Sequence, residues 1–238
     1  RASATPTHRR PRVTRSRMVP SIFPPALNVS TAPPRWVRDI SAVWQGRDVS
    51  SSARPLVLVV DDEEDVADTY ALHLAADYET RVVYGGEAAL EAMDEDVDAV
   101  LLDRRMPDLH GDEVLARLRE QGYDCPVIMT TAADPDLNIL EMDFDDYLAK
   151  PIDRETLRST LAQHLELATA GDPRLEEFFG IVSKLTVLQE QHTQDELGES
   201  EEFRRLRDRA EELADELRDS VSDFETIVAT YRDIDRGG

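Results

Sequence analysis

The sequence predicts an α/β domain built on a buried parallel sheet, followed by an all-α segment. Two observations carry this prediction. Between residues 56 and 168, short apolar runs alternate with amphipathic stretches, which is the pattern of repeated strand–helix units. After the sequence Gly171-Asp172-Pro173, apolar residues recur at helical spacing. We therefore expect a three-layer domain with helices on both faces of the sheet, and then a helical tail.

The predicted strands are continuous apolar runs, as a sheet buried on both faces requires. They are rich in leucine and β-branched residues, which favours strands over short helices. Pro126 stands at the first position of the fourth run, where a missing backbone donor is tolerated. The strands are predicted at residues 56–60, 81–84, 99–102, 127–129 and 147–149.

The amphipathic stretches between these runs predict helices. The last one is well marked, because Asp153 is a favourable N-cap and Leu157, Leu161 and Leu165 form one apolar stripe. The helices are predicted at residues 64–76, 87–95, 112–121, 136–141 and 154–168.

The pattern of apolar residues in the tail predicts two helices, at residues 174–191 and 200–235, with a polar connection around Gly198. Apolar residues of the second helix recur at alternating steps of three and four, which is a heptad pattern interrupted only by Ser220. An intramolecular antiparallel hairpin is the favoured interpretation, and an intermolecular coiled coil is the alternative. The heptad positions are Phe203, Leu206, Ala210, Leu213, Leu217, Ser220, Phe224, Ile227 and Tyr231, and the matching stripe of the first helix is Leu175, Phe178, Val182 and Leu185.

Charge is distributed unevenly along the chain, whose formal net charge is −23. Residues 1–55 hold ten arginines, two acids and eight of the 13 prolines, a net charge of +8, whereas the remainder carries 17 basic and 48 acidic residues, or −31. We expect residues 1–54 to be disordered, because their prolines and lack of periodicity prevent long helices and central strands. One hypothesis is a start site assigned too far upstream, with Val49 as the true start. The alternative is a basic arm that binds nucleic acid or a partner.

Composition limits the class of protein. The acidic excess disfavours non-specific binding to nucleic acid, whose charge Lys and Arg must neutralise. No apolar run is long enough to span a bilayer, and the single cysteine, Cys125, cannot form an intramolecular disulfide, so a cytoplasmic protein is expected. Two of the 27 basic residues are lysines, Lys150 and Lys184. This composition resembles that of halophilic proteins, and an acidic protein of a non-halophile is the alternative.

Polar residues follow four of the predicted strands. Asp61 and Asp62 come after the first strand, Asp103 after the third, Thr131 after the fourth and Lys150 after the fifth. In an open parallel sheet, ligands bind beyond the carboxyl ends of the strands. We therefore expect these five side chains to converge at one edge.

Such a cluster suits metal-assisted phosphoryl transfer. Two like charges about 4 Å apart repel by roughly 4 kcal/mol at an effective dielectric near 20, so the carboxylates call for a cation. Oxygen ligands favour a hard ion such as Mg²⁺. Asp103 is the predicted nucleophile, because it ends the middle strand and enters a loop, and its attack on phosphorus would form an acyl phosphate.

The order of these motifs resembles the receiver domain of two-component response regulators over about residues 55–168. The resemblance implies a flavodoxin-like (βα)5 doubly wound sheet with strand order 2-1-3-4-5. The motifs are Val59-Val60-Asp61-Asp62-Glu63, Leu102-Asp103-Arg104-Arg105-Met106-Pro107, Gly111, Thr130-Thr131-Ala132 and Asp146-Tyr147-Leu148-Ala149-Lys150-Pro151.

The resemblance also implies roles for the acidic residues. Asp103 would accept a phosphoryl group from a sensor histidine kinase. Asp62, Asp103 and the backbone carbonyl of Arg105 would ligate Mg²⁺, with Asp61 holding the metal through water or a weaker contact. Chemistry of this kind acts on the protein itself, so the chain is not expected to be an enzyme.

Further roles fall on the fourth and fifth strands. Lys150 would bind a phosphate oxygen, Thr131 would move to bond another, and Tyr147 would reorient with Thr131. The resemblance also suggests a cis bond between Lys150 and Pro151.

Two departures from the family pattern have consequences. The chain between Thr131 and Lys150 is short, so we expect the fourth helix to be reduced to a turn or two. Homodimerisation, which that surface usually supports, is thereby in doubt. Arg105 is large and cationic for a residue beside the attacking water, which predicts slow autodephosphorylation.

The tail resembles the HalX-type output domain of haloarchaeal regulators, over residues 175–236 after a linker at 169–174. We expect a signalling switch whose downstream partner is a protein of unknown identity, and the alternative is a DNA-binding transcriptional regulator acting through the C-terminal helices. A phosphohydrolase is disfavoured, because a second general acid beside the nucleophile is missing. The arginines at 204, 205, 207 and 209 sit among acids and are interpreted as a solvated, ion-paired face. Asp143, Asp145 and Asp146 are interpreted as solvated surface acids rather than a calcium loop.

Overall fold

The computed structural model describes residues 54–132, 135–222 and 224–233. All of these residues belong to one compact unit. The segment that the sequence predicts to be disordered, and with it the question of the start site, lies outside the described residues except for Arg54.

The sheet has five parallel strands in the order β2-β1-β3-β4-β5, which confirms the predicted fold class. The central strands β1 and β3 are almost wholly buried, as their continuous apolar runs require. Strand β3 extends one residue further than its apolar run, so Asp103 is its last residue. The strands are β1 (Leu56–Val60), β2 (Glu79–Val83), β3 (Val97–Asp103), β4 (Val127–Thr131) and β5 (Asp146–Ala149).

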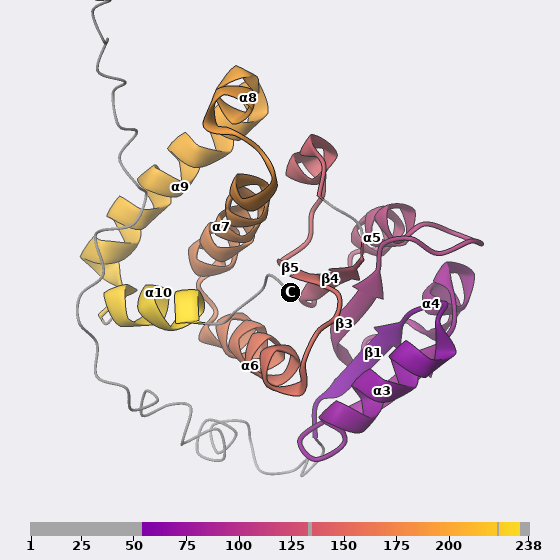
Figure 1. The fold of residues 1–238 in the computed structure, drawn as a ribbon. Coiled ribbons are helices and arrows are strands. Elements are labelled where there is room, and N and C mark those ends of the chain that lie inside the picture. Colours follow the sequence, from indigo (N-terminus) through magenta and orange to yellow (C-terminus); the bar gives the residue numbers. More distant parts are fainter. Residues whose placement is uncertain (1–53, 133–134, 223, 234–238) are drawn as a thin grey trace, which may run out of the picture. The chain divides into compact units, whose positions relative to one another are not determined.

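Helices cover both faces of the sheet (Figure 1). Tyr70 and Leu74 of α3 pack with Leu157 and Leu161 of α6 in the core on one face. Helices α4 and α5 pack together against the other face. Asp153 caps α6 as predicted, since its carboxylate accepts from the backbone N–H groups of the helix's first turn. The bounds are α3 (Glu64–Leu74), α4 (Gly86–Ala92), α5 (Gly111–Glu120), the 3₁₀ helix η2 (Leu137–Glu141) and α6 (Arg154–Ala170).

The shortened fourth helix is confirmed, because η2 is a single five-residue 3₁₀ helix. The linker predicted at residues 169–174 is wrong. Helix α6 continues to Ala170, and α7 begins at Pro173. Gly171 turns the chain with a left-handed φ of 69°, and Asp172 caps the next helix by accepting from the N–H of Arg174. Two residues therefore separate the helices of the receiver-like domain from those of the tail.

The tail contains four helices within the described residues rather than the two predicted. The helix expected at 200–235 ends at Ser220, and a new one begins at Phe224. A continuous helix would carry Tyr231 about 16 Å beyond Ser220. The break instead returns Phe224 to 5.3 Å from Phe178 and stacks Tyr231 on Phe179 at 4.5 Å. The bounds are α7 (Pro173–Gln191), α8 (Gln194–Glu199), α9 (Glu201–Ser220) and α10 (Phe224–Asp233).

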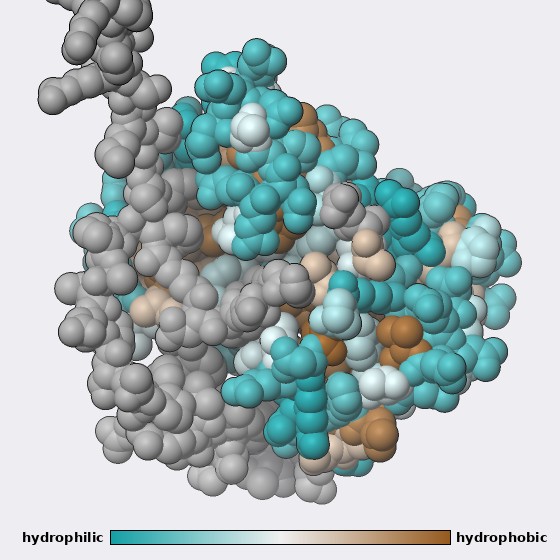
Figure 2. Space-filling model, in the orientation of Figure 1, coloured by the Kyte–Doolittle hydropathy of each residue, from teal (hydrophilic) through white to brown (hydrophobic). Residues whose placement is uncertain are grey.

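Helices α7 and α9 form the antiparallel hairpin that was the favoured interpretation of the heptad pattern. Arg209 of α9 pairs with Glu177 near the start of α7, and Ser220 at the end of α9 accepts from Arg174. Helix α7 lies between α9 and strand β5 (Figure 1), so it is buried on both sides. On the face shown in Figure 2, the surface around α8 is mainly hydrophilic.

Candidate functional site

The carboxyl ends of the strands bring the predicted site together. Asp61 directly follows β1, Asp103 ends β3, Thr131 ends β4 and Lys150 directly follows β5. Asp61, Asp62 and Asp103 each offer an oxygen within 4.8 Å of the others. The structure thus brings Asp61, Asp62, Asp103 and Lys150 together, because neighbouring parallel strands end at one edge of the sheet.

Lys150 lies between the two buried carboxylates. Its Nζ is 2.6 Å from Oδ2 of Asp61 and 2.7 Å from Oδ1 of Asp103, and Glu63 is more distant at 4.0 Å. Asp61 and Asp103 are 1% and 4% exposed, whereas Asp62 is exposed. The lysine thus compensates two charges that have left water.

Burial and ion pairing act in opposite directions on these groups. Burial raises the pKa of Asp61 above its ordinary value, although the bond and charge of Lys150 oppose the rise. Burial lowers the pKa of Lys150, but its hydrogen bonds to Asp103 and Asp61 and the negative charges of these groups together outweigh burial, so the net pKa is raised. The lysine is therefore fully cationic at neutral pH.

Backbone groups fix the two buried carboxylates. The N–H of Arg105 donates to Oδ2 of Asp103 at 2.7 Å, and the N–H of Glu63 donates to Oδ1 of Asp61 at 3.1 Å. Gly111 lets the start of α5 approach this strand end, because a Cβ there would meet the carbonyl oxygen of Asp103 at 2.2 Å. The side chain of Arg105 is exposed.

Thr131 and Tyr147 are both 1% exposed. The carbonyl of Thr131 accepts from the N–H of Lys150 at 2.8 Å, which ties the ends of β4 and β5 together. The ring of Tyr147 lies 5.9 Å from that of Phe144. The Lys150–Pro151 bond is cis, as the resemblance suggested.

Arg104 is a site neighbour that the sequence analysis missed. Its guanidinium is 8% exposed, pairs with Asp112 at 3.0 Å and reaches Asp136 at 3.5 Å. Burial raises the pKa of Tyr147, and the adjacent charge of Arg104 opposes this rise. The signal in the sequence was an arginine directly after Asp103, but its partners lie 8 and 32 residues away.

The donor set fits a hard divalent cation. All the candidate ligand atoms are oxygens, and two of the three carboxylates are buried with a single lysine between them. A metal that added positive charge here would offset the repulsion within the cluster. The part of the carbonyl of Arg105 in metal binding stays a prediction.

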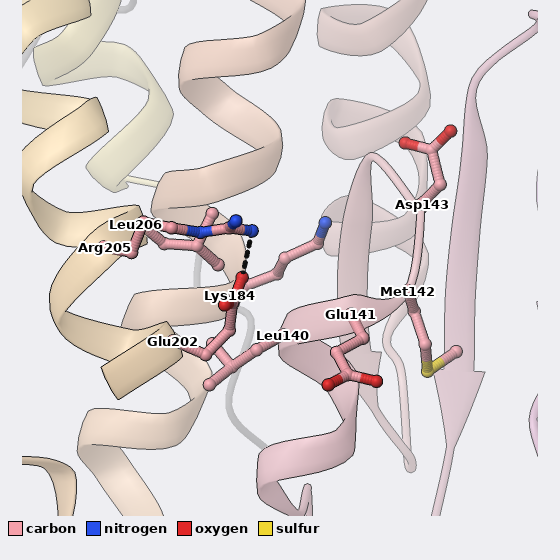
Figure 3. Close-up of a pocket in the computed structure, with 8 residues that line it drawn as sticks. All are labelled: Leu140, Glu141, Met142, Asp143, Lys184, Glu202, Arg205 and Leu206. Carbon is pink, nitrogen blue, oxygen red and sulfur yellow. Dashed lines mark hydrogen bonds and ion pairs between the residues drawn. The ribbon is translucent and has the colours of Figure 1, made fainter. Parts of the chain in front are cut away.

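A second concave region lies away from this cluster. The cavity, of about 490 Å³, lies between the η2–β5 segment and helices α7 and α9. On its α9 side, Arg205 pairs with Glu202 one turn earlier in the same helix, at 2.6 Å (Figure 3). The charges of these two lining residues thus neutralise each other. We therefore place the candidate site at the cluster of Asp61, Asp62 and Asp103.

Two family models match this chain. Residues 57–162 match the family model of the response regulator receiver domain, and residues 169–234 match that of the HalX domain. A solved receiver domain of a Francisella response regulator is 29% identical, with a TM-score of 0.44, and covers 48% of this chain and 99% of its own.

Two curated relatives extend the comparison. A Haloferax volcanii protein whose name describes a transcriptional regulator is 39% identical, over 78% of this chain and 33% of its own length. The transcriptional regulatory protein CpxR of Klebsiella pneumoniae is 36% identical, over 50% of this chain and 57% of its own. The chain thus spans from about a third to somewhat over half of these relatives.

The fold and the acidic site define residues 57–162 as a receiver domain of the response regulator family. The helices that follow belong to the HalX family, over residues 169–234, so the chain combines a receiver with a HalX domain. Among the described residues, no helix is long and apolar enough to cross a membrane.

Proposed function

We propose that this chain is a two-component response regulator that accepts a phosphoryl group on Asp103 and passes a conformational signal to its HalX helices. The observation that carries the proposal is the placement of Lys150 between Asp61 and Asp103, beside the exposed Asp62. A buried nucleophilic carboxylate, a lysine and an acidic metal-binding cluster are the parts that phosphoryl transfer needs.

In this mechanism, an oxygen of Asp103 attacks the phosphorus of a phosphohistidine on a sensor kinase. The new O–P bond forms as the P–N bond breaks, and the histidine nitrogen leaves with the electron pair. Asp61, Asp62, Asp103 and the carbonyl of Arg105 would hold Mg²⁺, which when bound neutralises charge on the phosphoryl oxygens. The bond from the N–H of Arg105 to Oδ2 of Asp103 orients the carboxylate for attack.

Lys150 supplies a second positive charge at the same edge. Its ammonium leaves its ion pair with Asp103 to bind an oxygen of the transferred group. Thr131, at the end of β4, donates its hydroxyl to another oxygen, and Tyr147 reorients with it. The chain performs this chemistry on itself and is no enzyme for an external substrate, and we place the exchange in the cytoplasm.

Phosphotransfer from radiolabelled sensor kinases, and from a labelled acyl phosphate, tests the proposal. Wild type should become labelled in the presence of Mg²⁺ and lose most of the label when the metal is chelated. Asp103→Ala should take up no label, whereas Asp108→Asn is the matched control, because Asp108 caps α4 through the N–H groups of Gly86 and Glu87. If none of the donors labels the wild type, the assignment of Asp103 as the phosphoacceptor is refuted.

The helical tail favours a protein partner over DNA. Residues 171–238 hold nine basic and 19 acidic residues. Within the arginine cluster of α9, Arg205 pairs with Glu202, Arg207 with Asp208 and Arg209 with Glu177. These pairs support the interpretation of a solvated face. A gel shift of the full phosphorylated chain that weakens steeply with salt would favour the alternative, a DNA-binding regulator.

A further inference from the structure

Asp146 is a buried carboxylate that connects the receiver domain to the HalX helices. It is the first residue of β5, is fully buried and directly precedes Tyr147. This corrects the interpretation of Asp146 as a solvated surface acid, which followed from its polar neighbours in sequence. A charge at such a place needs partners, because burying an unpaired carboxylate is costly.

Three helices supply those partners. Oδ2 of Asp146 lies 2.9 Å from Nε2 of His164 on α6. Oδ1 accepts from the hydroxyl of Ser183 on α7 at 2.7 Å and from that of Tyr231 on α10 at 3.3 Å. Two of the three helices belong to the HalX domain. The carboxylate of Asp146 is therefore bonded to three helices, α6, α7 and α10, through residues that lie up to 85 positions away in sequence.

Oδ1 of Asp146 also accepts a hydrogen bond from Tyr147, the residue proposed to reorient with Thr131 on phosphorylation. The N–H of Tyr147 donates to Oδ1 of Asp146 at 2.9 Å, so Ser183, Tyr231 and Tyr147 share one acceptor atom. A shift of the Tyr147 backbone changes the geometry at that atom and hence both bonds to the HalX helices. A state of the receiver that displaces the backbone of β5 at Tyr147 would therefore alter the contacts of α7 and α10.

The bond to α10 is the weaker of the two. At 3.3 Å it exceeds the usual range for a hydroxyl donor, and the Tyr231 hydroxyl is also 3.3 Å from the carbonyl of Phe179. One hydroxyl hydrogen cannot serve both acceptors well. The bond from Ser183, at 2.7 Å, is well formed. Helix α10 is therefore the element that is released with the smaller change.

A second contact follows the same route. Nζ of Lys184, the residue after Ser183 on α7, lies 5.0 Å over the ring of Phe144. Phe144 in turn contacts the ring of Tyr147. Helix α7 thus contacts β5 through the hydrogen bond of Ser183 to Asp146, and the segment just before β5 through the contact of Lys184 with Phe144.

We propose that Asp146 is the coupling residue through which phosphorylation of Asp103 changes the packing of α7 and α10. This inference rests on the proposed function, since phosphorylation is the event that would reorient the Tyr147 ring and, with it, shift the backbone of β5. When Tyr147 moves, the shared oxygen of Asp146 loses its alignment with Tyr231 first and with Ser183 second. The HalX helices then loosen from β5 in that order.

Hydrogen exchange of the full chain, measured by mass spectrometry with and without an acyl phosphate and Mg²⁺, tests the inference. In wild type, phosphorylation should speed exchange of the amides in α10 roughly five-fold, the effect of losing one ordinary hydrogen bond. In Tyr231→Phe, exchange of α10 should already be fast without phosphate and should change little when phosphate is added. Ser183→Ala should remove the smaller response of α7.

Thr160→Val is the matched control. Thr160 is also fully buried and lies on α6, but its hydroxyl has no hydrogen-bond partner within the described part of the chain. This variant should respond to phosphorylation as wild type does. Circular dichroism of each variant establishes that it is folded, and Tyr231→Phe retains the ring that packs on Phe179.

Intact mass measures phosphorylation of Asp103 in the same samples. A wild type that takes up no phosphoryl group would overturn the proposed function and this inference with it. A phosphorylated wild type with unchanged exchange in α7 and α10 would overturn the coupling role alone. So would a Tyr231→Phe/Ser183→Ala double variant whose helices respond as strongly as those of wild type.

Discussion

Replacing Lys150 by methionine should destabilise the metal-free protein, because the two carboxylates beside its ammonium would lose their compensating charge. Each ion pair, at 2.6 and 2.7 Å, corresponds to an attraction of about 6 kcal/mol at an effective dielectric near 20. Desolvation of the ammonium offsets part of this attraction. Buried pairs that lose one partner typically cost about 3 to 5 kcal/mol, which is the loss expected for Lys150→Met at neutral pH.

The loss of stability in Lys150→Met should be larger at neutral pH than at acidic pH. Burial raises the pKa of Asp61 in the folded protein, and removal of the lysine raises it further. The folded variant therefore binds a proton more tightly than the unfolded chain does, so its stability falls as pH rises through the carboxyl range. The difference from wild type should be largest near pH 7 and should shrink on acidification. Mg²⁺ should restore more stability to the variant than to wild type.

Denaturant unfolding followed by circular dichroism measures these differences, since both tryptophans, Trp36 and Trp44, lie outside the described residues. Lys184→Met is the matched control. Lys184 is also buried, with a pKa lowered by that burial, and it forms no ion pair with a described residue. Its replacement should leave stability unchanged or raise it. Equal losses in the two variants, or a Lys150→Met as stable as wild type, would refute the argument.

Two further predictions concern the phosphoacceptor loop and the tail. Gly111→Ala should cost about 1 to 3 kcal/mol of stability, because its Cβ would meet the carbonyl oxygen of Asp103 at 2.2 Å. Gly180→Ala should instead gain up to about 1 kcal/mol, because Gly180 lies in a helix and the atom nearest to its Cβ would be 3.5 Å away. Unfolding curves of the two variants check this, and a loss at Gly180 as large as at Gly111 would contradict it. Arg105→Asn should shorten the half-life of the phosphorylated protein, because the exposed cationic side chain shields the acyl phosphate from water. An unchanged rate of phosphate loss would show that Arg105 has no such role.

The strands and the site could be predicted from the sequence because both depend on residues that are adjacent in the chain. A continuous run such as residues 56–60 is compatible with few environments other than a buried strand, and the residue after it must lie at the edge of the sheet. Asp61, Asp103 and Lys150 could therefore be assigned to one cluster before their distances were known. The single missed neighbour, Arg104, depends on partners from α5 and from the segment before η2.

The tail shows where local pattern failed. Its heptad spacing runs from Phe203 to Tyr231 with Ser220 as its one polar position, and the helix stops at Ser220. Periodicity reports which face of a helix is apolar, but it does not report where the apolar partner lies. Phe178 and Phe179 on α7 are close enough to bury Phe224 and Tyr231 only if the chain turns.

By itself, the sequence determined a parallel five-strand α/β domain and the acidic cluster with its lysine, and it favoured a helical hairpin in the tail over an intermolecular coiled coil. The tertiary structure alone decided that Asp146 is buried and that His164, Ser183 and Tyr231 converge on it. Short-range periodicity and strand ends are encoded within a few residues of the chain. The bonds of Asp146 join elements up to 85 residues apart, and such contacts exist only once the sheet, the hairpin and α10 have packed together.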